Sequence, residues 1–211
     1  MSRCVVVLGM HRSGTSMVSG ILQKLGIFMG ERFRDADAHN ENGYFEDLDW
    51  RDINKAILMA LGGTWYNPPR QNLVDKTSIH SELICDLIES REKYSVWGFK
   101  DPRTCITIPI ISKHLPNPLY VYVRREPRDV VMSLMKRAQL RGYYREPESW
   151  LELVNDYERR IKDFLSMGND FTTVTYEQIT EDPDNQVMGL AYTVGIKDKD
   201  KICEAIATVR T

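Results

Sequence analysis

The sequence of 211 residues lacks the features that assign a chain to the commonest special classes. Cysteine is scarce, and no two of the four lie close enough together to form a metal-binding pair. No apolar run approaches the roughly 20 residues of a membrane-spanning helix, and no targeting segment precedes the first expected strand. The formal net charge of −2 indicates no overall preference for nucleic acid or a membrane surface. We therefore expect a soluble cytoplasmic protein with free thiols at Cys4, Cys85, Cys105 and Cys203.

Apolar residues make up 42% of the chain, enough for the core of one domain over residues 1–211. Alternating strands and helices predict an α/β fold with a P-loop-like three-layer α/β/α architecture and a central parallel sheet. Ligands of such sheets bind at the carboxyl ends of the strands. The expected strands are 4–8, 95–99, 119–123 and 171–175, and the expected helices are 17–25, 48–61, 76–93, 106–114, 130–139, 148–166 and most of the tail.

The strongest local pattern is the join between the first strand and the first helix. Gly9 and Gly14 flank a loop with the outer spacing of a Walker A motif, which binds phosphate through backbone N–H groups and a helix N-terminus. Thr15 stands where a nucleotide-triphosphate enzyme has its lysine, so Arg12 is the cation that remains in the loop. Thr15 or Ser16 could instead act only as the helix N-cap, but a cap needs one hydroxyl, and the surplus favours an anion.

A second anion-binding pattern follows the third expected strand. Arg124 and Arg125 end this apolar strand, and Ser133 follows on the next helix, where its hydroxyl can face back. Arginine at this point suits bidentate binding of phosphate. The alternatives are a capped helix start, in which Asp129 complements the helix dipole, and a surface ion pair between Glu126 and one arginine.

Together the two patterns resemble the sulfotransferase family, and other segments resemble its bacterial-type branch. The family's 5′-phosphosulfate loop has a lysine or arginine followed by Ser-Gly-Thr and a hydroxyl residue, and Arg12–Ser16 match it. The family's 3′-phosphate motif is Arg-x-Pro-Arg-Asp with a serine eight residues after the first arginine, a register that Arg125–Ser133 fit. Further similar segments are Asn42–Glu46, Trp97–Arg103, Thr175–Glu177 and Asp182–Pro183.

The resemblance implies an enzyme that moves a sulfuryl group from 3′-phosphoadenosine 5′-phosphosulfate (PAPS) to a hydroxyl or amine acceptor. It implies that Arg12 contacts the sulfuryl group and the bridging oxygen, and that Lys100 steadies the leaving group. Because a sulfuryl group carries less charge than a phosphoryl group, no metal is expected. The nucleotide-binding residues that it implies are Arg12, Ser13, Gly14, Thr15 and Ser16 at the 5′ end, Arg125 and Ser133 at the 3′-phosphate, and Tyr176 near the adenine.

The catalytic base departs from the family's cytosolic branch, in which a histidine lies two residues after the strand-end lysine. Pro102 occupies that position in this chain. We expect Glu46 to be the base and rank Glu41 second, although either glutamate could simply belong to a solvated acidic loop. Asp101 and Arg103 could form a structural ion pair beneath the site. The lone histidines His11 and His39 are given no catalytic role.

Two other functions remain open. A P-loop kinase for small molecules would need the missing lysine and a carboxylate that binds a metal. A non-catalytic nucleotide-binding module of sulfotransferase fold is kept because the sequence shows no glycine- and lysine-rich C-terminal segment like that of the cytosolic branch. The acceptor is a small molecule or a glycan, and no nucleic-acid partner is expected. Candidate acceptor residues are Trp50, Trp65, Tyr66, Tyr143 and Tyr144 for an apolar or sugar-stacking pocket, and Arg141 and Arg145 for an acidic acceptor.

Overall fold

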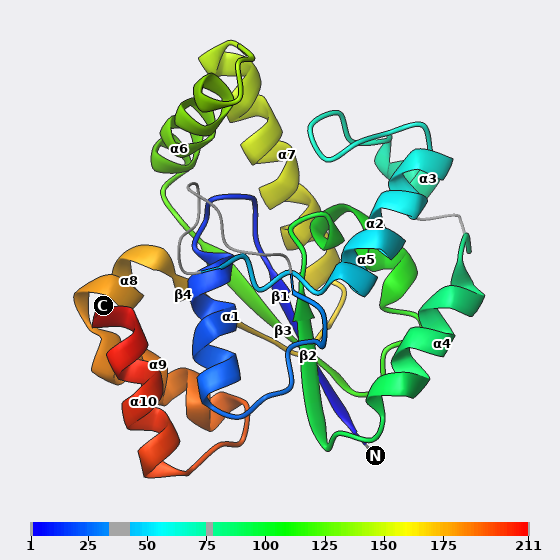
Figure 1. Ribbon diagram of the computed structural model, residues 1–211. Helices are drawn as coiled ribbons and strands as arrows, with labels where there is room; N and C mark the ends of the chain where they lie inside the picture. The colour runs from blue at the N-terminus through cyan, green and yellow to red at the C-terminus, as the bar shows by residue number, and fades with distance from the viewer. Residues whose placement is uncertain (1, 34–42, 75–77, 211) are drawn as a thin grey trace.

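A sheet of four parallel strands forms the centre of the computed structural model, which describes residues 2–33, 43–74 and 78–210 (Figure 1). The strands lie in the order β2-β1-β3-β4. Their bounds are Arg3–Leu8 for β1, Val96–Lys100 for β2, Pro118–Arg124 for β3 and Phe171–Thr175 for β4. All four predicted strands are therefore confirmed, each to within one residue at either end.

Both faces of the sheet are buried along β1, β2 and β3, as the continuous apolar runs of these strands require. Successive side chains of a strand point to opposite faces. Along β1, Cys4, Val6 and Leu8 join one core cluster, and Val5 and Val7 join the other. Helices must therefore cover each face.

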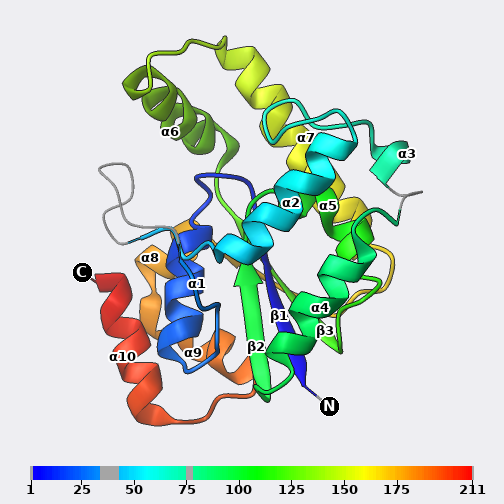
Figure 2. The same cartoon turned by 45° about the vertical axis from the view of Figure 1, so that its right-hand side comes forward.

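The helices form a layer on either side of the sheet, which confirms the predicted three-layer α/β/α fold (Figures 1 and 2). One layer contains α1 (Thr15–Lys24), α9 (Pro183–Thr193) and α10 (Lys199–Arg210). The other contains α2 (Leu48–Ala60), α4 (Ser81–Arg91), α5 (Thr104–Ile111), α6 (Pro127–Leu140) and α7 (Pro147–Leu165). The short helices are α3 (Gln71–Val74) and α8 (Tyr176–Glu181).

Several helix boundaries differ from the prediction, and the helix predicted over 106–114 is found at Thr104–Ile111. The helix predicted over 76–93 begins only at Ser81, because His80 before it has a left-handed backbone with φ 61°. The helix predicted from about residue 130 begins at Pro127, since the fixed φ of proline suits a first helical position. The four-residue helix α3 is too short to have a recognisable period and was not predicted.

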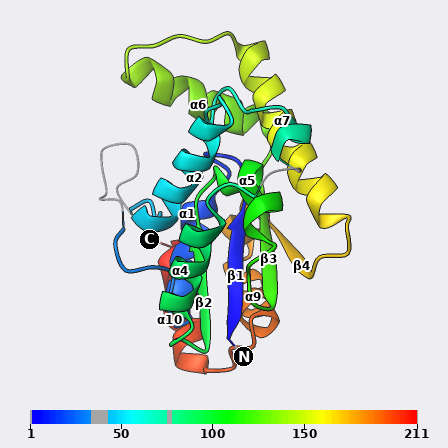
Figure 3. The same ribbon diagram turned by 90° about the vertical axis from the view of Figure 1, so that its right-hand side faces the viewer.

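The α6 and α7 pair extends past the carboxyl ends of the strands (Figure 3). The segment between α2 and α3 lies beside α7, and the Tyr157 hydroxyl on α7 donates to the Trp65 carbonyl at 2.7 Å. These elements build walls above the edge of the sheet at which ligands of parallel sheets bind. Within the described part of the chain, no helix combines the length and apolar character needed to cross a membrane.

Candidate functional site

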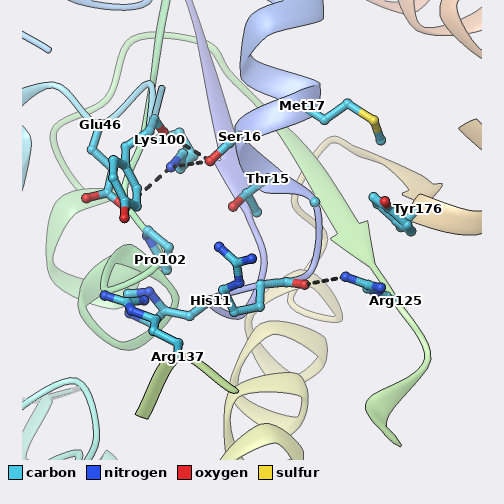
Figure 4. Close-up of a pocket in the computed structure, with 13 residues that line it drawn as sticks. His11, Thr15, Ser16, Met17, Glu46, Lys100, Pro102, Arg125, Arg137 and Tyr176 are labelled. Carbon is cyan, nitrogen blue, oxygen red and sulfur yellow. Dashed lines mark hydrogen bonds and ion pairs between the residues drawn. The ribbon is translucent and has the colours of Figure 1, made fainter. Parts of the chain in front are cut away.

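A cavity of about 210 Å³ lies at the carboxyl edge of the sheet, against the start of α1 (Figure 4). We call it the basic cavity, because four of its described lining residues are basic and one is acidic. Apart from Ser13 and Ser133, the site residues predicted from the sequence come together here from five separate segments of the chain. The lining residues are His11, Arg12, Gly14, Thr15, Ser16, Met17, Tyr44, Glu46, Lys100, Pro102, Arg125, Arg137 and Tyr176.

The glycine loop places the N-terminus of α1 at this cavity. Gly14 is the N-cap residue, with φ 94°, and no side chain caps the helix. The Val18 N–H donates to the Gly14 carbonyl at 3.2 Å, so the N–H groups before Val18 lie ahead of the first intrahelical bond. The alternative in which Thr15 or Ser16 serves only as the N-cap is therefore wrong. Both residues line the cavity instead.

Glycine is required at position 14 for two reasons. Its φ of 94° lies in the left-handed region that residues with a Cβ rarely adopt. A Cβ at this position would also lie 2.7 Å from Cδ2 of Tyr176, so that ring could not keep its place beside the loop.

Ser13 is turned away from the cavity. Its hydroxyl donates to the Met10 carbonyl at 2.7 Å, and its backbone N–H donates to the same carbonyl at 3.2 Å. Both of its hydrogen-bond donors are thus used to close the loop. Gly14, Thr15 and Ser16 are the loop residues that remain at the cavity.

Arg12 joins the two anion-binding patterns of the sequence. Its Nε donates to the Ser133 hydroxyl at 2.8 Å, and its own carbonyl accepts from Nη1 of Arg125 at 3.2 Å. The Arg125 guanidinium lies over the Tyr176 ring, 4.3 Å from its centroid. Ser133 thus lies behind Arg12, and the structure holds all four residues in one connected group.

Lys100 and Glu46 form a buried ion pair at the far wall of the cavity. The Lys100 ammonium lies 3.4 Å from Oε1 of Glu46 and 3.4 Å from the Ser16 hydroxyl (Figure 4). Only 1% of the Lys100 side chain and 4% of the Glu46 side chain are exposed. Burial lowers the pKa of Lys100 from its usual value, although the charge of Glu46 opposes this shift.

The segment that carries Glu46 is fixed by its neighbours in the chain. Tyr44 is buried and lines the cavity, and Asp47 caps α2 by accepting from the Asp49 N–H at 3.1 Å. The buried Arg91 guanidinium donates to Asp47 at 3.1 Å. Tyr44 and Asp47, which flank Phe45 and Glu46 in the chain, are both fixed in place. The Glu46 carboxylate is therefore held in position rather than solvated.

The ion pair predicted beneath the site is present, with 2.8 Å between Arg103 Nη1 and Asp101 Oδ1. Asp101 is fully buried and also accepts from the Asn54 amide at 3.3 Å. Burial raises the pKa of Asp101, while the charge of Arg103 opposes the shift. Pro102, between the two, turns its ring to the cavity wall.

His11 lines the cavity, although no role was predicted for it. It is 5% exposed, and its ring centroid lies 4.4 Å from that of Trp65 and 6.4 Å from that of Tyr157. Burial holds the pKa of His11 well below 6.5, and nearby cations, Arg103 foremost, lower it further. His11 is thus a neutral imidazole in a basic cavity. Its position in the glycine loop, between Gly9 and Gly14, is the sequence feature that could have identified it as a site residue. Glu41 and His39 lie outside the described residues.

The aromatic residues predicted for the acceptor separate into two groups. Trp50 is 1% exposed and stacks on Phe99 at 3.8 Å between ring centroids, so its assignment to an acceptor pocket was wrong. It belongs to the core because α2 packs that face against the sheet. The other predicted residues do line one pocket, namely Trp65, Tyr66, Arg141, Tyr143, Tyr144 and Arg145.

A basic cavity at a helix N-terminus, on the carboxyl edge of a parallel sheet, is the arrangement in which α/β proteins bind phosphate-like groups. No group of three or more histidine, cysteine, aspartate or glutamate side chains suited to a metal occurs among the described residues. Residues 4–200 match the model of the sulfotransferase family, and the chain belongs to that family. This confirms the family predicted from the sequence. No curated protein matches the chain.

Solved sulfotransferase structures share the fold at low sequence identity. The sulfotransferase domain of the Synechococcus olefin synthase is 15% identical, with a TM-score of 0.59 over 97% of this chain and 77% of that one. A Mycobacterium tuberculosis sulfotransferase is 15% identical, with a TM-score of 0.55 over 99% and 71%. A mouse sulfotransferase complexed with 3′-phosphoadenosine 5′-phosphate (PAP) is 9% identical, with a TM-score of 0.56 over 99% and 63%. The chain thus spans less than two thirds of the mouse protein.

Proposed function

We propose that this protein transfers a sulfuryl group from PAPS to a hydroxyl or amine acceptor, and that the basic cavity receives the phosphosulfate end of the donor. The observation that carries the proposal is the charge of the cavity. Arg12, Lys100, Arg125 and Arg137 line it together with a single described carboxylate, Glu46, beside a helix N-terminus. Such a set suits a multiply charged anion. The mouse relative of the same fold, complexed with PAP, supports this choice of donor.

The residues present fit a nucleotide of this kind. Nε of Arg125 is buried and has no hydrogen-bond partner among the described residues, so a donor is in place for an anion. The volume of about 210 Å³ is below the 300–1,000 Å³ of common ligand sites. We infer that the cavity encloses only the phosphosulfate, and that the adenosine lies outside it, on the side of Tyr176.

The proposed division of work follows from the contacts. When bound, PAPS supplies the sulfuryl group. Glu46 accepts the proton of the attacking hydroxyl, and Lys100 and Arg12 donate to the oxygens on which negative charge develops. Because Lys100 is already 3.4 Å from Glu46, the base and the cation lie on the same wall of the cavity.

Arg125 and Ser133 are proposed to hold the 3′-phosphate. The Ser133 oxygen accepts from Arg12, which leaves its own O–H to be donated to a phosphate oxygen. The same serine then orients Arg12 toward the sulfuryl group. The 3′-phosphate and the sulfuryl group of the donor would thus be bound by residues that are in direct contact with each other.

The test is a comparison of thermal stabilisation by PAP, ADP and ATP, followed by transfer of radiolabelled sulfate from PAPS to a panel of acceptors. A ligand present at 100 times its Kd adds about 2.7 kcal/mol of apparent stability. We expect PAP to raise the Tm more than ADP, which lacks the 3′-phosphate. Equal shifts with the two would contradict the assignment of Arg125 and Ser133, and magnesium-dependent turnover of ATP would contradict the function.

A further inference from the structure

A second hollow adjoins the basic cavity, and aromatic side chains form its walls. Its volume is about 530 Å³. It lies between the segment that joins α2 to α3 and the turn that joins α6 to α7, which Figure 2 shows above the carboxyl ends of the strands. We call it the aromatic pocket, and its aromatic residues are Trp65, Tyr66, Tyr143, Tyr144 and Trp150.

Trp65 connects the aromatic pocket to the basic cavity. Its ring centroid lies 4.4 Å from that of His11 and 5.9 Å from the Arg137 guanidinium, and both of these residues line the basic cavity. Toward the aromatic pocket, the Trp65 ring meets those of Tyr66 at 5.4 Å and Trp150 at 6.2 Å. A ligand held against Trp65 therefore lies beside two residues, His11 and Arg137, that line the basic cavity.

The tyrosines of the pocket are open to solvent. The exposed fraction is 75% for Tyr144, 52% for Tyr66 and 41% for Tyr143. Exposed aromatic side chains that gather around one hollow, rather than scattering over the surface, are typical of a binding site. The pocket therefore offers flat apolar faces to a ligand that brings its own ring.

The polar groups of the pocket favour an anionic ring over a sugar. No carboxylate or amide side chain is found among the described residues that line it, so a sugar's many hydroxyl protons would find few acceptors. Arg145 is part of the wall, since it donates to the Tyr66 carbonyl at 2.8 Å and lies 5.0 Å from the Trp150 ring. Arg141 is exposed at the pocket and can meet a negative charge.

We propose that the aromatic pocket binds the acceptor, and that the acceptor is a planar aromatic hydroxy compound with a negatively charged group remote from its hydroxyl. This assignment rests on the proposed sulfotransferase function. The ring lies among Trp65, Tyr143 and Tyr144, the hydroxyl points past Trp65 toward Glu46, and the charged group faces Arg141.

The experiment uses 4-hydroxyphenylacetate and its uncharged methyl ester, with methyl glucoside as the sugar. Binding is followed by tryptophan fluorescence of the full chain, and transfer is followed with radiolabelled PAPS in parallel. Wild-type protein should bind the carboxylate about threefold more tightly than the ester, as an exposed ion pair allows. Arg141→Gln should remove this preference. Arg70→Gln, another exposed arginine, should keep it.

The ring contacts are tested with Trp65→Leu and with the exposed Tyr143→Ala and Tyr144→Ala. Each should weaken binding of both phenols, about tenfold for Trp65→Leu, while PAP still raises the Tm. Tyr192→Leu is the matched control, because Tyr192 is 57% exposed on α9, outside the pocket.

The outcomes separate this inference from the proposed function. Transfer to methyl glucoside but to neither phenol would overturn the acceptor class and leave the function standing. Phenol binding that none of the pocket variants weakens would overturn the pocket assignment. Binding that follows the expected pattern, with no transfer to any acceptor and no stabilisation by PAP, would support the pocket and contradict the sulfotransferase function.

Discussion

Replacing Glu46 with glutamine tests whether this residue is the catalytic base or only a structural carboxylate. Glutamine keeps the shape of the side chain but accepts no proton at neutral pH. The loss of a general base typically lowers kcat by 10²- to 10⁴-fold. We expect a fall in this range for sulfate transfer from PAPS to a hydroxyl acceptor, measured with the label on the sulfuryl group.

The same change should strengthen the binding of PAP. Glu46 is the one acidic side chain among the described residues of the basic cavity, so its removal leaves the cations there without an opposing charge. Coulomb attraction at this scale amounts to about 1 kcal/mol, or roughly fivefold in Kd. Titration calorimetry with PAP measures this gain directly.

Stability should move in the opposite direction. Breaking a buried ion pair on one side costs about 3–5 kcal/mol, and Lys100 would lose its partner at 3.4 Å. The glutamine oxygen still accepts from Lys100, so this figure is an upper bound for the loss seen in urea denaturation. Adding Lys100→Met to Glu46→Gln should recover most of the stability, since apolar replacements of buried pairs are often neutral.

Turnover by Glu46→Gln at the wild-type rate would show that Glu46 is not the base. A fall in kcat only in proportion to the folded fraction would likewise refute the role, because Glu46 would then be a structural partner of Lys100 and nothing more. Slower turnover together with tighter PAP binding is the combination that a merely structural role does not produce.

Three further predictions concern the cations and His11. Arg125→Gln should weaken PAP binding by about 10- to 100-fold and abolish the preference over ADP, whereas Arg124→Gln, its exposed neighbour, should not. Arg12→Ala should lower kcat on the order of 100-fold with a much smaller effect on PAP, and near-normal kcat would refute its role. Because the pKa of His11 is below 6.5 in the fold, the unfolded chain binds the proton first as pH falls, so stability is lost below about pH 6.5. Between pH 7.5 and 5, wild type should lose up to about 2 kcal/mol more than His11→Gln in urea denaturation, and parallel curves would show that His11 titrates normally.

Local patterns were sufficient for the strands and for most of the donor site. The apolar run of β1, the glycines of the loop and the strand-end position of Lys100 are all properties of neighbouring residues. A buried parallel strand needs such a run, and the loop after it must start at the sheet's carboxyl edge. The residues proposed to hold the donor could therefore be found from the sequence.

Contacts between segments that are distant in the sequence could not be predicted from these local patterns. His11 is neutral because Trp65, 54 positions later, and Tyr157 from α7 cover it. Trp50 and Trp65 are equally aromatic in the sequence, but only Trp65 lies at a pocket, since Trp50 is on the face of α2 that packs against Phe99. The periodicity of a sequence shows that a residue lies on an apolar face, but it does not show which other residues cover that face.

The order of the strands decides which of the predicted residues meet. Pairing of β3 with β4 sets Arg124 beside Thr175, so the next residues along, Arg125 and Tyr176, leave the sheet side by side and stack at 4.3 Å. Pairing of β1 with β2 likewise sets Val7 beside Lys100, which brings the ammonium to the start of α1. The sequence shows that each of these residues ends or follows a strand, but not that β1 is flanked by β2 and β3. A different order would keep every motif and would separate Lys100 from the helix N-terminus that it now adjoins.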